Sequence, residues 1–136
     1  MRKAPAFILA LLIIAIILNI SVPTKQGVNY KVTVYRIPLY IKIIEFIDRD
    51  YRYRSLSRGI VSGVNGDEKK ALKILEWVRS NIRSDIPKDW PVYDDHILNI
   101  LIRGYGASDQ ISDVFTTLCM YSGLPAGWAR ITIPGY

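Results

Sequence analysis

Residues 103–126 read RGYGASDQISDVFTTLCMYSGLPA, and the interpretation of the whole chain depends on this stretch. It begins with a glycine-rich run in which Gly104 and Gly106 flank Tyr105, and the run has no helical period. Two glycines so close together allow a positive φ or a close approach of the backbone. The run therefore predicts a tight turn immediately before a helix.

An amphipathic helix is expected after this turn, beginning at Ser108 or Asp109. Its apolar residues recur at i, i+3, i+4, i+7 and i+8, so that one stripe faces a core. Gly123 is the predicted C′ residue, and Pro125 prevents the helix from continuing. The residues of the stripe are Ile111, Val114, Phe115, Leu118 and Cys119.

Ser108 is the candidate site residue because of its place at the start of this helix. A side chain there lies at the positive end of the helix dipole, beside unpaired N–H groups that can also hold an oxyanion. A cysteine in this position would have a lowered pKa and would be a nucleophile. The serine has two interpretations: a helix N-cap, which the position itself favours, or a hydroxyl nucleophile, which needs a general base.

The stretch resembles the active-site motif of the transglutaminase-like family, one of the papain-like cysteine enzymes. That motif has a glycine-rich approach, a cysteine, and a helix that ends in a Gly-Ile-Pro-Ala-Arg-like exit. Here the exit reads Gly-Leu-Pro-Ala at residues 123–126, Gly127 stands where the family often has arginine, and the nucleophile position falls on Ser108. The resemblance extends over about residues 68–133, because residues 70–82, KALKILEWVRSNI, resemble the helix that precedes the nucleophile.

The resemblance implies an α+β fold, in which the nucleophile helix packs on an incomplete antiparallel sheet of a papain-like domain. It also implies cysteine-dependent acyl transfer or amide hydrolysis as the family chemistry. Family members take a histidine and then an aspartate from two strands after the nucleophile helix. Only the strand-like run Trp128–Ile133 follows here, and it contains neither residue. We therefore expect an inactive core, which is either an evolved scaffold or a truncated frame, and the missing strands favour truncation.

A serine hydrolase is the alternative enzyme. It would use Ser108 with His96, which is the one histidine of the sequence and follows Asp94 and Asp95. Cys119 lies eleven residues beyond Ser108, in the apolar stripe, and is expected to be a core thiol. With one cysteine and one histidine, the sequence excludes an intramolecular disulfide and indicates neither a metal site nor a cofactor.

The first 24 residues are expected to form a transmembrane signal anchor. Residues 5–22, PAFILALLIIAIILNISV, carry no charge across eighteen positions. Such a run is just long enough to span a hydrocarbon core of about 30 Å. The alternative is a cleaved signal peptide, for which residues 19–21 make a poor cleavage site. With Arg2 and Lys3 in the cytoplasm, the sequence predicts a single-pass membrane protein with an extracytoplasmic body.

Two further segments are predicted after the anchor, a basic strand–helix segment at residues 25–63 and a truncated transglutaminase-like core at residues 64–136. A strand is expected at Val28–Ile37 from its alternating pattern, and a helix is expected from Glu68 to about Ile82 with Asp67 as N-cap. The glycines of residues 59–66 mark the boundary between the two segments.

Positive charge is concentrated in the basic segment. Residues 25–58 hold eight Lys or Arg against three acidic residues, a net charge of +5. The arginines alternate with tyrosines, and the first interpretation is a solvated helix end with arginine stems packed on tyrosine rings. The alternative is a non-catalytic interaction or scaffold module that binds anionic lipid headgroups or a protein partner, with no nucleic acid expected. The residues that would bind are Arg49, Arg52, Arg54 and Arg58.

Overall fold

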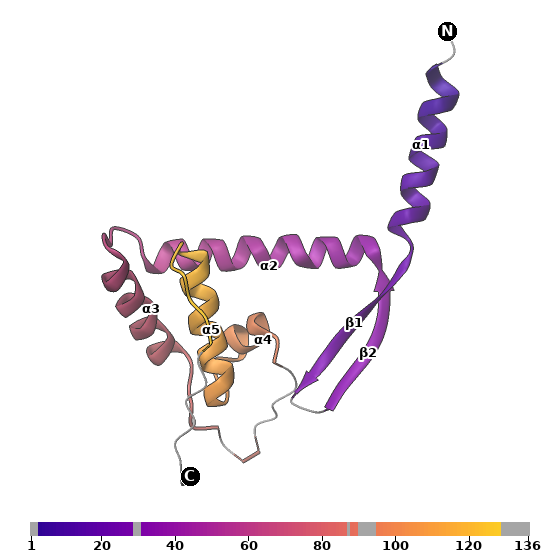
Figure 1. Cartoon of the computed structure of the whole chain (residues 1–136). Coiled ribbons are helices and arrows are strands. Elements are labelled where there is room, and N and C mark those ends of the chain that lie inside the picture. Colours follow the sequence, from indigo (N-terminus) through magenta and orange to yellow (C-terminus); the bar gives the residue numbers. More distant parts are fainter. Residues whose placement is uncertain (1–2, 29–30, 87, 90–94, 129–136) are drawn as a thin grey trace. The chain divides into compact units, whose positions relative to one another are not determined.

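The computed structural model describes residues 3–28, 31–86, 88–89 and 95–128 (Figure 1). The chain divides into two compact units, Met1–Asp50 and Tyr51–Tyr136, and each is described by itself. The helices are α1 (Lys3–Leu18), α2 (Leu39–Ile60), α3 (Asp67–Asn81), α4 (Ile97–Arg103) and α5 (Ser108–Tyr121), and the strands are β1 (Ser21–Val28) and β2 (Lys31–Pro38).

The first unit contains a two-stranded antiparallel sheet. The register runs from Ser21 opposite Pro38 to Val28 opposite Lys31. The predicted strand at Val28–Ile37 is confirmed from Lys31 onward, while Val28 belongs to β1. β1 was not predicted, because Pro23 and Gly27 are weak strand formers that interrupt its pattern.

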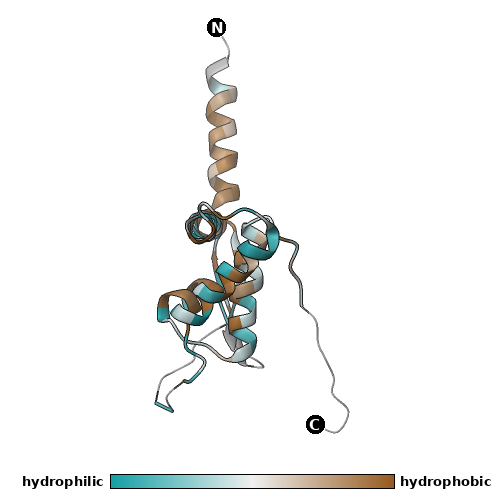
Figure 2. Ribbon diagram, turned by 90° about the vertical axis from the view of Figure 1, so that its left-hand side faces the viewer, coloured by the Kyte–Doolittle hydropathy of each residue, from teal (hydrophilic) through white to brown (hydrophobic). Residues whose placement is uncertain are grey.

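The length of the N-terminal helix contradicts the predicted membrane anchor. Figure 2 shows apolar residues along most of α1, but the helix has 16 residues. At 1.5 Å per residue it is about 24 Å long, which is less than a hydrocarbon core of about 30 Å. The chain enters β1 at Ser21, so the apolar run does not continue as a helix. No helix within the described residues is long and apolar enough to cross a membrane, and the prediction of a single-pass membrane protein is therefore wrong.

The second unit is built around the contacts of α5 with α3 and α4 (Figure 1). The predicted helix at Glu68–Ile82 is confirmed as α3, although its N-cap is Gly66 and Asp67 is its first residue. The apolar stripes of the three helices meet, and Ile74 and Ile100 are fully buried there. The buried residues of this core are Ile74, Val78, Ile82, Ile100, Val114, Leu118, Cys119 and Leu124.

The predicted α+β class is confirmed, and the partners of α5 among the described residues are helices. We expected the nucleophile helix to pack on an incomplete antiparallel sheet. The described sheet consists of β1 and β2, which lie in the first unit, whereas α5 packs on helices in the second. Within the described residues, the apolar stripe of α5 packs against those of α3 and α4, and a strand after residue 128 stays a prediction.

Two predictions are not decided by these elements. The strand expected at Trp128–Ile133 lies outside the described residues from residue 129 onward. The segment boundaries at residues 24 and 63 also stay predictions.

Candidate functional site

The candidate site begins with Ser108, which is the first residue of α5. The prediction that the helix begins at Ser108 or Asp109 is confirmed. The N-cap, however, is Ala107, with extended backbone at φ −68° and ψ 166°. Ser108 is exposed, and its hydroxyl does not serve as the cap. The interpretation of Ser108 as the helix N-cap is therefore wrong by one position.

The glycine-rich turn before Ser108 is held by the segment that follows α3. Gly104 ends α4 in the left-handed conformation, with φ 70°. The backbone N–H of Arg83 donates to the Gly104 carbonyl at 2.9 Å, and the N–H of Gly106 donates to the Arg83 carbonyl at 3.0 Å. Arg83 alone thus bonds to both glycines, and these bonds fix the backbone that leads into α5.

Gly106 also lies where an added side chain would be crowded. A Cβ atom built there would lie 3.1 Å from Gln110 Oε1 and 3.3 Å from Ile100 Cγ2. Both distances are tighter than ordinary van der Waals contacts. Of the two possibilities that the sequence left open for these glycines, close approach is the one seen at Gly106, whose φ is not positive.

The side-chain amide of Gln110, two residues after Ser108, is buried and hydrogen-bonded. Gln110 is only 2% exposed, and its Oε1 accepts from Arg103 Nη2 at 2.8 Å and from the Ala107 N–H at 3.0 Å. Its Nε2 donates to Asp95 Oδ1. Arg103 also donates through Nε to the Tyr105 carbonyl at 2.8 Å, so the polar groups behind the turn form one connected cluster.

His96 caps α4 in this structure. Its Nδ1 accepts from the Leu98 N–H at 3.3 Å. In a neutral imidazole the nitrogen that accepts carries no proton, so the ring proton is assigned to Nε2. A general base needs a free acceptor nitrogen facing the nucleophile. The described hydrogen bonds therefore give His96 a structural role and connect Asp95 to Gln110; Asp94 lies outside the described residues.

Cys119 lies in the core, as predicted. It is 2% exposed, and burial raises the pKa of its thiol because desolvation disfavours the thiolate. The described residues contain no cluster of His, Cys, Asp and Glu that could hold a metal ion.

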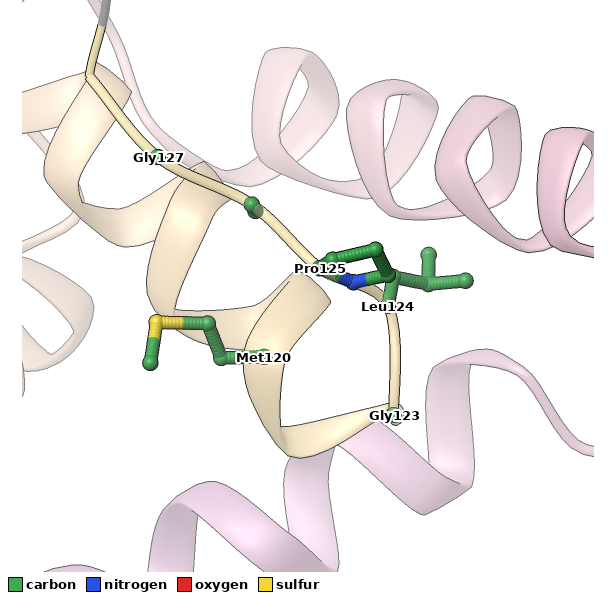
Figure 3. A pocket seen from close by; sticks show the side chains of 6 residues that line it. Met120, Gly123, Leu124, Pro125 and Gly127 are labelled. Carbon is green, nitrogen blue, oxygen red and sulfur yellow. The ribbon is translucent and has the colours of Figure 1, made fainter.

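The exit of α5 follows the predicted pattern. Gly123 has a positive φ of 80°, and the Leu124 N–H donates to the Cys119 carbonyl at 3.0 Å. Leu124 is buried in the core. A shallow apolar depression of about 640 Å³ lies over this exit, beside Met120 and Pro125 (Figure 3). Trp128 Nε1 donates to Asp113 Oδ1 at 2.7 Å and holds the exit segment against α5.

Two residues that organise the site, Gln110 and Arg103, were not predicted from the sequence. A glutamine at the third position of a helix is half of a capping-box signature. That signature was concealed because its first position is Ala107 instead of serine or threonine. Arg103 had no local signal, since its partners lie in the turn and on the next helix.

The sequence profile of the Transglutaminase-like superfamily matches residues 54–134. The matched range covers more than half of the 136 residues and includes α3, the glycine-rich turn and α5. No curated protein and no solved structure matches the chain.

Proposed function

The chain belongs to the transglutaminase-like superfamily, and from this membership we propose that residues 54–134 form a core in which Ser108 occupies the nucleophile position without carrying out acyl transfer. The observation that carries the proposal is the place of Ser108, an exposed first residue of α5 directly after the glycine-rich turn. It stands fifteen residues before Gly123, which opens the Gly-Leu-Pro-Ala exit.

The chemistry of the family explains why this position matters. A thiolate attacks a carboxamide or peptide carbonyl, and ammonia or the peptide amine leaves after a general acid has protonated the nitrogen. The thioester that forms is then resolved by an amine or water. The first N–H groups of a helix have no intrahelical partner, so they can stabilise the oxyanion that develops on the carbonyl oxygen. A residue at the start of α5 is therefore suited to both tasks.

The hydroxyl of Ser108 does not supply the missing reactivity. A helix dipole stabilises a negative charge by about 0.3 to 1 kcal/mol, which lowers a pKa by less than about one unit. An alkyl hydroxyl therefore stays protonated near neutral pH and needs a general base. His96 caps α4 through Nδ1, which argues against its service as that base. We infer a binding or scaffold role for the core.

Two measurements test the proposal. In the first, the purified protein is treated with a fluorophosphonate probe, and we expect no labelling. Labelling that is lost in Ser108→Ala would instead establish a serine hydrolase and contradict the proposal.

In the second measurement, Ser108→Cys is alkylated with iodoacetamide across a range of pH. We expect the thiol at residue 108 to have a pKa about 0.2 to 0.7 unit below the value of about 8.5 for a free cysteine. An ordinary pKa at this position would show that the start of α5 is not an activating site, and the assignment of the nucleophile position would fail.

The basic end of α2 is a second candidate for function. Arg52, Arg54 and Arg58 are exposed, while Arg49 is half-buried. The Arg54 guanidinium lies 5.7 Å from the centre of the Tyr121 ring, so part of this charge is used in packing. We propose that this end of the helix binds an anionic partner, either a lipid headgroup or an acidic protein surface.

The experiment for this second proposal compares charge reversals. Arg52→Glu combined with Arg58→Glu is expected to remove binding of the protein to phosphatidylserine vesicles or to a polyglutamate column. The matched control is Lys69→Glu combined with Lys73→Glu, which reverses two exposed charges on α3. Equal loss in both pairs would show a general charge effect and would contradict a site on α2.

A further inference from the structure

Gln110 is a polar residue that is almost completely buried, although it lies in the first turn of a helix. Its side chain is 2% exposed, and a buried amide is unfavourable unless its donors and acceptors are bonded. The oxygen accepts from Arg103 and from the Ala107 N–H, and the nitrogen donates to Asp95. The amide is therefore held from both ends.

These contacts join three separate segments around the start of α5. Asp95 precedes α4, Arg103 ends α4, and Ala107 is the N-cap of α5. Ser108 lies in the chain between Ala107 and Gln110, so its backbone is restrained on both sides. The N–H of Gln110 is itself bonded to Asp109 Oδ1 at 2.9 Å, which leaves the first turn of α5 ordered by side chains.

We propose that Gln110 is a positioning residue for the nucleophile position, because its buried amide fixes Ala107 and thereby sets where residue 108 enters α5. The inference rests on the proposed function, which assigns the nucleophile position to residue 108. Gln110 acts through the backbone of Ala107 and needs no contact with a substrate. Without the amide, the first turn of α5 would fray, and residue 108 would lose its place at the end of the dipole.

The test uses the full chain with Ser108→Cys as a reporter. The thiol is alkylated with iodoacetamide at a series of pH values, and the product is digested with trypsin and with a protease that cleaves before aspartate. Cleavage before Asp109 and Asp113 places residue 108 and Cys119 on different peptides. Mass spectrometry then gives the apparent pKa of the thiol at residue 108 alone.

Two variants remove the positioning contacts in this reporter protein. Gln110→Met replaces the amide with an apolar chain of similar length, and we expect the apparent pKa at residue 108 to rise toward that of a free cysteine, by up to about 0.7 unit. Asp95→Ala removes the acceptor of the amide and is expected to raise the pKa as well. Loss of a nearby negative charge alone would lower a thiol pKa, so a rise in Asp95→Ala reports lost positioning.

Ser57→Ala is the control for general loss of stability. Ser57 Oγ donates to the Leu118 carbonyl at 2.9 Å, near the other end of α5. This variant is expected to weaken the fold and to leave the pKa at residue 108 unchanged. A rise in all three variants would reflect destabilisation and would overturn the inference.

Two other outcomes separate the inference from the function on which it rests. A lowered pKa at residue 108 that neither Gln110→Met nor Asp95→Ala changes would overturn the positioning role and leave the proposed function standing. An ordinary pKa with Gln110 in place would overturn both. If Gln110→Met does not fold, Asp95→Ala decides the question.

Discussion

The guanidinium of Arg103, at the end of α4, lies 2.8 Å from the side-chain oxygen of Gln110, in the first turn of α5. The two residues enclose the glycine-rich turn, since Arg103 also donates to the Tyr105 carbonyl. The cationic group lies 5.3 Å from the centre of the Tyr105 ring. The turn that leads into α5 is thus closed by one side chain from each flanking helix.

Arg103→Lys is expected to destabilise the protein by about 1 to 3 kcal/mol, because hydrogen bonds from charged groups are strong and an ammonium cannot reproduce the fork of a guanidinium. Urea unfolding measures the effect. The control is Arg79→Lys in α3, an exposed position for which we expect less than about 0.5 kcal/mol. Equal effects at the two positions would show that Arg103 contributes no more than a surface charge.

Gly106→Ala is expected to destabilise the protein by about 1 to 3 kcal/mol, because the added Cβ would press on Gln110 and Ile100. Gly59→Ala provides the opposite case. Gly59 lies within α2 with nothing within 4 Å of an added Cβ, so alanine should stabilise the helix by about 0.5 to 1 kcal/mol. Thermal unfolding of both variants gives the two signs, and a stable Gly106→Ala protein would contradict the close packing.

Ser57→Ala removes a buried hydroxyl that bonds to the Leu118 carbonyl and to the Ser122 hydroxyl. We expect a loss of about 0.5 to 1.5 kcal/mol, the net contribution of a typical hydrogen bond, because the Leu118 carbonyl still accepts from the Ser122 N–H at 3.0 Å. Ser55→Ala is the matched control on the exposed side of α2. If the two variants unfold at the same urea concentration, the contact between α2 and α5 does not contribute to stability.

Cys119 makes stability depend on pH in the alkaline range. Burial raises the pKa of its thiol in the folded state, so the unfolded chain releases this proton at a lower pH than the folded one. The contribution of this thiol to the free energy of unfolding is fully present below the pKa of a cysteine in the unfolded chain, about 8.5. It is lost as the pH rises through the higher pKa of the folded state.

The comparison with Cys119→Ala isolates this effect from the tyrosines and lysines, which titrate in both proteins. Urea midpoints measured between about pH 7 and pH 10 should fall more steeply for the wild-type protein than for the variant. Parallel slopes would mean that the thiol titrates alike in the folded and unfolded states.

Local patterns predicted much of the second unit. The apolar stripes gave α3 and α5 nearly to the residue, and Gly104 and Gly123 have the positive φ that a turn and a helix end require. These features depend on residues within a few positions of one another, so the sequence contains all the information needed. The same locality explains why Ser108 was identified as the start of a helix before any contact was known.

Tertiary structure alone decided the partners. The sequence does not say that α5 packs on α3 and α4, because an apolar stripe indicates that a helix face is buried and leaves open what covers it. Nor does it say that Gln110 is buried, since its partners Asp95 and Arg103 come from elsewhere in the chain. The apolar run at the N-terminus was overestimated for a related reason: hydropathy measures composition, whereas the pairing of β1 with β2 determines where the helix ends.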